Sequence, residues 1–202
     1  MLISLYPNNI IYSNRPKKNI AYTGFLPKMK EDFFARSRNG HLLKDTFNKE
    51  TNTLDIYSSG LYPANVLSNL APKEFVFDGV KCASIEGFLQ SLKVKDKIKQ
   101  KEICGMYGGS AKERSKKFTQ WLSTHKLYWQ EDEYDRFSNK YNKLLVRAFK
   151  ACYEQNAIFR QALKDTCGKT LTHTRGKSDA ATTIITKEEF IKILTDLRDS
   201  NG

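Results

Sequence analysis

Three polar side chains in the segment "SIEGFLQSLK", residues 84–93, have types and spacing that could do chemistry together. They are the carboxylate of Glu86, the amide of Gln90 and the amine of Lys93, which fall on one side of a helix, and Lys97 continues the stripe. Apolar residues flank this stripe on both sides. One interpretation is a solvated face whose members stabilise one another. The other is the wall of a pocket, with the helix dipole stabilising the charge of Glu86.

The elements around this stripe follow from local patterns. A helix is predicted from about Ile85 to Lys99, because Ser84 is a suitable N-cap. Before it, "EFVFDGVKCAS" predicts a hairpin whose turn is Asp78-Gly79. Alternating apolar residues predict a short strand in "TLDIYSSG", and "KTLTHT" predicts another strand or an extended loop.

Helices dominate the second half of the chain. The capping-box pattern "SAKE", residues 110–113, predicts a helix to about Leu122. Apolar residues at helical spacing predict a long helical region over 138–163, broken near 154–157. A second capping box, "TKEE", predicts a final helix that ends near Asp199. The fold class is therefore α+β, mostly α with a few short β-strands.

Composition predicts one folded unit with anionic partners. The chain has 202 residues, of which 40% are hydrophobic, so a core can form over residues 51–202. Residues 1–50 contain basic, turn-rich pieces and are interpreted as an N-terminal extension or cap. Lys and Arg number 34 against 22 Asp and Glu, a net charge of +12, which favours nucleic acid, nucleotides or phosphorylated small molecules.

Metal sites, secretion and membrane insertion are not indicated by the sequence. The four cysteines form no C-x-x-C pair, and the three histidines do not lie at zinc-ligand spacing beside them. No signal peptide and no apolar stretch of membrane-spanning length is visible. We therefore expect a cytoplasmic protein with reduced thiols, no metal and no cofactor.

The run "LSNLAPKEFVFDGVKCASIEGFLQSLKV", residues 67–94, resembles the signature of the NADAR, or YbiA-like, family. That signature is a Ser-Asn-Phe/Leu segment, an apolar strand, an Asp-Gly turn and then Ser-x-Glu-x-x-x-Gln-x-x-Lys. The segments "YGGSAKERSKK", "LLVRAFKACYEQNAIFRQALKDT" and "ILTDLR" are similar to later parts of the family pattern. The resemblance covers about residues 54–199 and implies a single compact YbiA/NADAR-like domain.

The resemblance implies an N-glycosidase, a hydrolase that cleaves the C1′–N bond between a ribose and a base-like nitrogen. Glu86 matches the family's catalytic glutamate, which stabilises positive charge on the sugar or activates water. Lys93 matches the family's lysine and could keep Glu86 ionised, bind a phosphate or attack C1′. Asn69 of the Ser-Asn segment and Gln90 are implied to bind the substrate.

Two further residues are candidate substrate ligands. Arg114 lies in a glycine-led helix start, a position that can bind phosphate, and the family has an arginine nearby. His173 lies in "LTHTRGKSD", residues 171–179, where the family's late glutamate and tryptophan are absent. We expect His173 either to replace part of that second polar site or to be a local hydrogen-bonding residue.

Several functions fit these residues. The first is removal of ADP-ribose from modified guanine in nucleic acid, which the net charge and the basic N-terminal region favour. The second is cleavage of phosphorylated riboflavin-pathway intermediates, which needs only a local basic pocket for a ribosyl-phosphate metabolite. A non-catalytic module that binds ADP-ribose or nucleotides and a basic nucleic-acid-binding protein without a pocket are the alternatives that are not enzymes.

Overall fold

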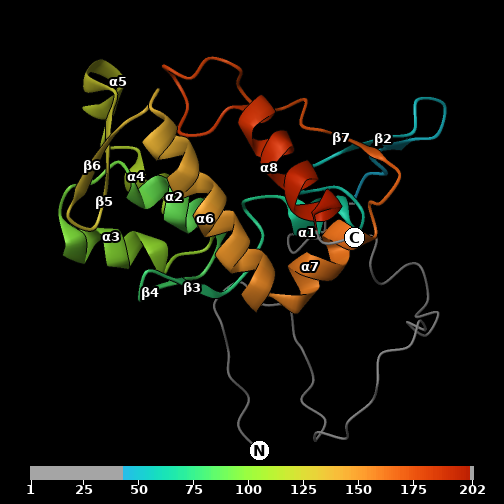
Figure 1. Cartoon of the computed structure of the whole chain (residues 1–202), viewed down its shortest axis with the longest axis horizontal. Helices are drawn as coiled ribbons and strands as arrows, with labels where there is room; N and C mark the ends of the chain where they lie inside the picture. The colour runs from blue at the N-terminus through green and yellow to red at the C-terminus, as the bar shows by residue number, and fades with distance from the viewer. Residues whose placement is uncertain (1–42, 201–202) are drawn as a thin grey trace, which may run out of the picture.

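The computed structural model describes residues 43–200, which form eight helices and seven short strands (Figure 1). The helices are α1 (Ala64–Leu67), α2 (Ile85–Ser91), α3 (Lys97–Cys104), α4 (Gly108–Ser115), α5 (Trp121–Thr124), α6 (Asn139–Gln155), α7 (Ala157–Lys164) and α8 (Lys187–Asp199). The strands are β1 (Phe47–Asn48), β2 (Thr53–Asp55), β3 (Phe75–Phe77), β4 (Val80–Cys82), β5 (Lys126–Trp129), β6 (Asp132–Asp135) and β7 (Thr170–Thr172). The predicted α+β class, mostly α with a few short strands, is confirmed.

Helix α6 forms the centre of the domain. Figure 1 shows it crossing the middle of the molecule, with α2 to α5 on one side and α7 and α8 on the other. The residues that the sequence predicted at helical spacing are buried, namely Tyr141, Leu144, Leu145, Ala148, Phe149 and Cys152, and Tyr153 is buried beside them. One continuous core therefore joins the segment that carries the polar stripe to the C-terminal helices.

Three small sheets surround this helical core. Strand β2 pairs antiparallel with β1 and parallel with β7, so the N-terminal and C-terminal parts of the domain meet in one sheet. The predicted β3–β4 hairpin is confirmed, and its turn residues Asp78 and Gly79 both have positive φ, 46° and 78°. The β5–β6 hairpin was not predicted from the sequence.

The predicted helix from Ile85 to Lys99 is wrong in its length, because two helices occupy this stretch. Helix α2 ends at Ser91, and Asp96 begins α3 by accepting hydrogen bonds from the backbone N–H groups of Ile98 and Lys99 at 2.9 and 3.0 Å. Lys97 therefore belongs to a different helix and does not continue the polar stripe.

The predicted helix over 110–122 is also corrected. Helix α4 begins at Gly108 after Tyr107, ends at Ser115, and is followed by the separate short helix α5. The first residue of α4 packs closely, since a Cβ atom at Gly108 would lie 2.4 Å from the Cα atom of Leu70. The capping box predicted at residues 110–113 is therefore not the helix start.

The later helices follow their predictions. The break between α6 and α7 falls at Asn156, whose side chain accepts a hydrogen bond from the Phe159 N–H at 3.0 Å. The "TKEE" capping box opens α8, with Thr186 and Glu189 each accepting from the other's backbone N–H.

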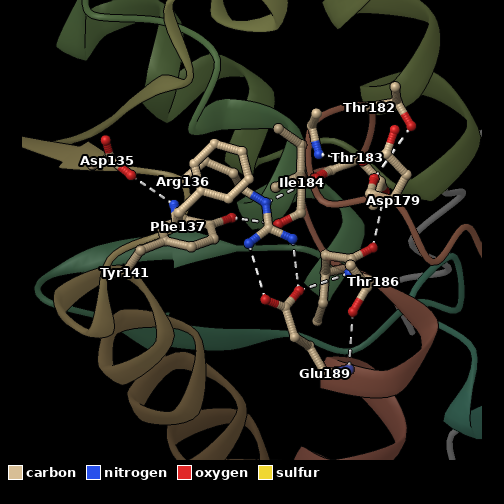
Figure 2. A network of polar contacts seen from close by, with 12 residues as sticks. Asp135, Arg136, Phe137, Tyr141, Asp179, Thr182, Thr183, Ile184, Thr186 and Glu189 are labelled. Atoms are coloured by element: carbon tan, nitrogen blue, oxygen red, sulfur yellow. Dashed lines mark hydrogen bonds and ion pairs between the residues drawn. The ribbon is translucent and has the colours of Figure 1, made fainter.

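A buried ion pair ties α8 to the end of β6 (Figure 2). Arg136 is 1% exposed and donates to both oxygens of Glu189, at 2.9 and 2.7 Å. It also donates to the Thr183 carbonyl at 2.8 Å and lies over the Tyr141 ring. Glu189 accepts a further hydrogen bond from the Thr186 N–H at 2.7 Å. The network fixes the loop before α8 against α6.

The first part of the chain is described from residue 43 onward. Most of the predicted N-terminal extension, residues 1–42, lies outside the described residues, whereas Phe47 and Asn48 at its end pair with Leu54 and Thr53. Within residues 43–200, no helix combines the length and the apolar character that crossing a bilayer requires.

Candidate active site

Glu86 and Gln90 lie inside the protein, each only 7% exposed. The Gln90 Nε2 donates to Glu86 Oε1 at 2.8 Å, and the Ser115 hydroxyl of α4 donates to Gln90 Oε1. This chain of hydroxyl, amide and carboxylate fixes the orientation of the Glu86 side chain. The stripe is therefore not a solvated face, and Ser115 is a member of the cluster that sequence reasoning missed.

Two glycines allow the close packing that buries these polar groups. A Cβ atom at Gly87 would lie 2.8 Å from the carbonyl oxygens of Cys104 and Met106, and Gly108 lies against the backbone of Leu70. Any side chain at either position would push neighbouring segments apart. Gly87, directly after the glutamate, is thus required by the packing in this chain.

The apolar side of α2 is held by an aromatic cluster. The Phe88 ring packs edge-on against Phe77 of β3 and Trp129 of β5, with centroids 5.3 and 5.1 Å apart. At the N-terminus of α2, the Ser84 hydroxyl accepts from the Gly87 N–H at 2.9 Å. These contacts set the rotation of α2, so Glu86 and Gln90 face α4.

Asn69 and Glu86 are in contact through their backbones. The backbone N–H of Glu86 donates to the Asn69 carbonyl at 3.0 Å, which joins the Ser-Asn segment to the first turn of α2. The Asn69 Oδ1 is buried and has no hydrogen-bond partner within residues 43–200. An unsatisfied buried acceptor costs free energy, so this oxygen is suited to a donor from a bound molecule.

Lys73 is a buried neighbour of this site that sequence reasoning missed. It is 1% exposed, and its Nζ donates to the carbonyls of Val66, at 2.8 Å, and Ser68. Burial lowers the pKa of Lys73 to about 8, whereas the neighbouring Cys152 and Glu86 oppose that shift. Lys73 thereby holds the segment that leads into Asn69 and places an ammonium group near the Glu86 carboxylate.

The alternation of inward and outward residues along β3 places Lys73 on the inward side. Phe75 and Phe77 of β3 point inward, and period-two alternation extended backward places Lys73 on the same side. Its backbone N–H donates to the Ala83 carbonyl at 2.9 Å, which continues the hairpin beyond the assigned strands. Lysine is so seldom buried that the pattern alone did not indicate an inward side chain.

Lys93 lies in the turn after α2 and is half-buried. Its Nζ is 3.5 Å from the Ser115 Oγ and 5.8 Å from the centroid of the Trp121 ring. Burial lowers the pKa of Lys93, the Glu86 carboxylate opposes this, and the charge of Lys112 lowers it further. Glu86, Gln90 and Lys93 thus belong to one cluster, with Ser115 between the amide and the amine.

Arg114 and His173, the other two predicted substrate ligands, have different partners. The guanidinium of Arg114 is 2.8 Å from the Glu102 carboxylate, and both side chains are substantially exposed. The His173 Nδ1 is 2.8 Å from the Ile56 carbonyl, and its ring packs edge-on against Phe190. Neither side chain has a contact with Glu86 in the described part of the chain. Their substrate-binding roles stay predictions.

The segment around His173 is occupied by local hydrogen bonds. Thr174 donates to the Asp55 carboxylate through its backbone N–H at 2.8 Å and its hydroxyl at 2.7 Å. A side chain at Gly176 would collide with His173 and Lys187. Across residues 43–200, no group of three His, Cys, Asp or Glu side chains is arranged to hold a metal ion.

The fold is of the YbiA-like, NADAR type. The NMR structure of the Escherichia coli protein YbiA superposes with a TM-score of 0.53 at 18% identity, over 79% of this chain and 90% of that one. The resemblance found in residues 67–94 is thereby confirmed.

The chain belongs to the bacteriophage protein GP30.3 family, whose sequence model matches residues 61–199. A relative in Enterobacteria phage T4 is an uncharacterized 17.1 kDa protein of the Gp30–rIII intergenic region. It is 36% identical over 151 residues, which are 73% of this chain and 97% of the relative.

Proposed function

We propose that this protein is an N-glycosidase that hydrolyses the C1′–N bond joining ADP-ribose to guanine in nucleic acid. The observation that carries the proposal is the buried carboxylate of Glu86, on a residue whose backbone N–H is bonded to Asn69, the residue with the unpartnered Oδ1. N-glycosidase chemistry is associated with NADAR-type proteins, and Glu86 and Asn69 occupy the positions of that family's motif residues.

The chemistry needs one negative group at the sugar. As the C1′–N bond breaks, its electron pair leaves with the base, and positive charge develops on C1′ and the ring oxygen. Glu86 faces that charge, and its carboxylate accepts the proton of the water whose oxygen bonds to C1′. The departing guanine nitrogen takes up a proton, so the products are guanine and free ADP-ribose.

The surrounding groups prepare the carboxylate for this role. Gln90, held by Ser115, fixes one Glu86 oxygen and prevents the side chain from turning away. The positively charged side chains of Lys73 and Lys93 lie within electrostatic range of the Glu86 carboxylate. The Asn69 Oδ1 accepts a hydrogen bond from a ribose hydroxyl or from an N–H of the base.

The choice of nucleic acid over a small metabolite rests on charge. The net charge of +12 over 202 residues exceeds what a single phosphorylated metabolite requires. A phosphorylated riboflavin-pathway intermediate is the alternative substrate for the same chemistry, because it carries the same ribose C1′–N bond.

The test is release of ADP-ribose from a DNA oligonucleotide that carries one ADP-ribosylated guanine, followed by mass spectrometry. Wild type should release ADP-ribose and leave unmodified guanine, whereas Glu86→Gln should release none. Glu102→Gln is the matched control, because it makes the same chemical change at an exposed carboxylate. Turnover of only the ribosylamino-pyrimidine phosphate, assayed in parallel, would assign the enzyme to the metabolite instead.

A second candidate, a non-catalytic binding module, is favoured by one observation. His173 and Thr174 are engaged with Ile56 and Asp55, where the family has a second polar site. If this candidate is right, Glu86→Gln changes the affinity for ADP-ribose little and wild type shows no turnover.

A further inference from the structure

The cations of α4 differ from one another in their partners. Arg114 pairs with Glu102 at 2.8 Å, and Lys116, directly after the helix, pairs with Glu113 at 2.5 Å. Lys112 lies on the same helix, is exposed, and has no carboxylate partner among residues 43–200. Within this group of basic residues, Lys112 thus keeps an uncompensated charge.

The Lys112 charge acts on Lys93. Lys112 precedes Ser115 by one helical turn, and the Ser115 Oγ is 3.5 Å from the Lys93 Nζ. Lys93 also has no carboxylate within ion-pair distance in the described chain, and Lys112 adds to the lowering of its pKa. The Ser115 hydroxyl is also 3.1 Å from the Lys112 carbonyl oxygen, so Lys93 and Lys112 flank the same hydroxyl where α2 and α4 pack together.

The Glu86 carboxylate offsets part of the repulsion at Lys93, and a further anion between the two lysines would offset more of it. Two like charges repel, and the half-buried position of Lys93 reduces the screening by water. A phosphate group can accept hydrogen bonds from both amines and remove the repulsion. Carboxylates pair directly with Arg114 and Lys116, whereas among residues 43–200 Lys93 and Lys112 have no carboxylate within ion-pair distance and only Glu86 acts on Lys93 from farther away.

We propose that Lys93 and Lys112 form a subsite for the phosphate of a sugar-phosphate ligand whose ribose lies at Glu86. Ser115 links the two ends of this site, because its hydroxyl donates to Gln90, which donates to Glu86, while Lys93 lies beside the same hydroxyl. The inference rests on the proposed function for the identity of the sugar. It gives Lys93 one of the three roles that its position in the sequence left open, phosphate binding.

The ligand chemistry is a phosphate ester, which has two sources. In ADP-ribose it is the pyrophosphate, and in ribose 5-phosphate it is the terminal monophosphate. Calorimetric titration of the full chain with ADP-ribose, ribose 5-phosphate and unphosphorylated ribose separates these sources. Ribose measures what the sugar contributes without phosphate.

Lys112→Gln is the informative variant, because Lys112 is exposed and its removal leaves the core intact. We expect about a tenfold loss of affinity for the phosphorylated ligand, since one charge-assisted hydrogen bond is removed. Lys116→Gln is the matched control, because it removes the same charge from a side chain that already has a carboxylate partner. Its affinity should stay within about twofold of wild type.

Three outcomes would overturn the subsite: equal losses in both variants, no loss in Lys112→Gln, or no binding of either phosphorylated ligand to wild type. Equal losses would indicate a general effect of net charge. If Lys112→Gln weakens binding but wild type hydrolyses no substrate, the subsite stands and the N-glycosidase proposal fails. If Glu86→Gln abolishes hydrolysis while Lys112→Gln binds normally, the N-glycosidase proposal stands and the phosphate subsite fails.

Discussion

Two carboxylates on opposite sides of α6, Glu189 and Glu86, are both largely withdrawn from water but are satisfied in different ways. Glu189 receives two hydrogen bonds from the Arg136 guanidinium and one from the Thr186 backbone. Glu86 receives one from the amide of Gln90, and the lysines near it form no ion pair with it. The first arrangement fixes a fold, whereas the second leaves a carboxylate able to respond to charge that develops on a bound molecule.

The largest expected effect is on enzymatic activity and comes from changing Glu86, the first carboxylate to test in this comparison. Glu86→Gln should lower the rate of ADP-ribose release by at least ~10³-fold, since the group facing the developing charge is neutralised. Thermal unfolding should shift little, because glutamine keeps the size and can still bond to Gln90. A variant with wild-type rates would remove Glu86 from the mechanism.

The next effect concerns stability at the other carboxylate. Arg136→Met should lower the free energy of unfolding by about 3–5 kcal/mol, because it leaves Glu189 without its buried partner. Chemical denaturation measures this loss, and the activity per folded molecule should be unchanged. A loss of activity in fully folded protein would show that the network also serves the site.

A smaller effect comes from the pH dependence of Lys73. Its pKa is about 8 in the folded protein and 10.5 when unperturbed, so the unfolded chain binds more protons between these values. Stability therefore rises with pH across this window, by up to about 3 kcal/mol relative to Lys73→Met. Urea denaturation of both proteins at about pH 7.5 and at about pH 10, near the two ends of that window, gives the difference. A constant difference would contradict a depressed pKa.

The smallest effect is expected at the surface pair. Arg114→Gln should change the free energy of unfolding by less than about 1 kcal/mol, because Arg114 and Glu102 are exposed and screened by water. Since Glu102 already occupies the guanidinium, the affinity for ADP-ribose should also stay near that of wild type. A large loss of affinity would restore the substrate-binding role that the sequence suggested for Arg114.

Local patterns predicted most of the helical framework. Three features could be predicted because each depends on residues within a few positions of one another. They are the apolar spacing in α6, the break at Asn156 and the capping box at Thr186. The β3–β4 turn was equally local. The division between α2 and α3 was missed, because the Asp96 cap competed with an apolar pattern that continued through it.

The site itself was predicted only in part. The angular arrangement of Glu86, Gln90 and Lys93 follows from helix geometry, but their burial depends on where α4 lies. That position is set by close contacts at Gly87 and Gly108 with segments distant in sequence. Ser115 became visible only through this packing, so it could not be found from spacing.

The parallel pairing of β2 with β7 has a consequence for where the domain can be cut. The family match begins at residue 61, yet Thr53–Asp55 supply the neighbour of Thr170–Thr172, and Ile56 supplies the carbonyl beside His173. A fragment that started at the family boundary would remove the strand that pairs with β7, leave both edges of β7 open and expose Leu171 to water. Such an edge recruits other chains, so the shortened protein would tend to self-associate, and the upstream residues belong to the folding unit although the family pattern does not include them.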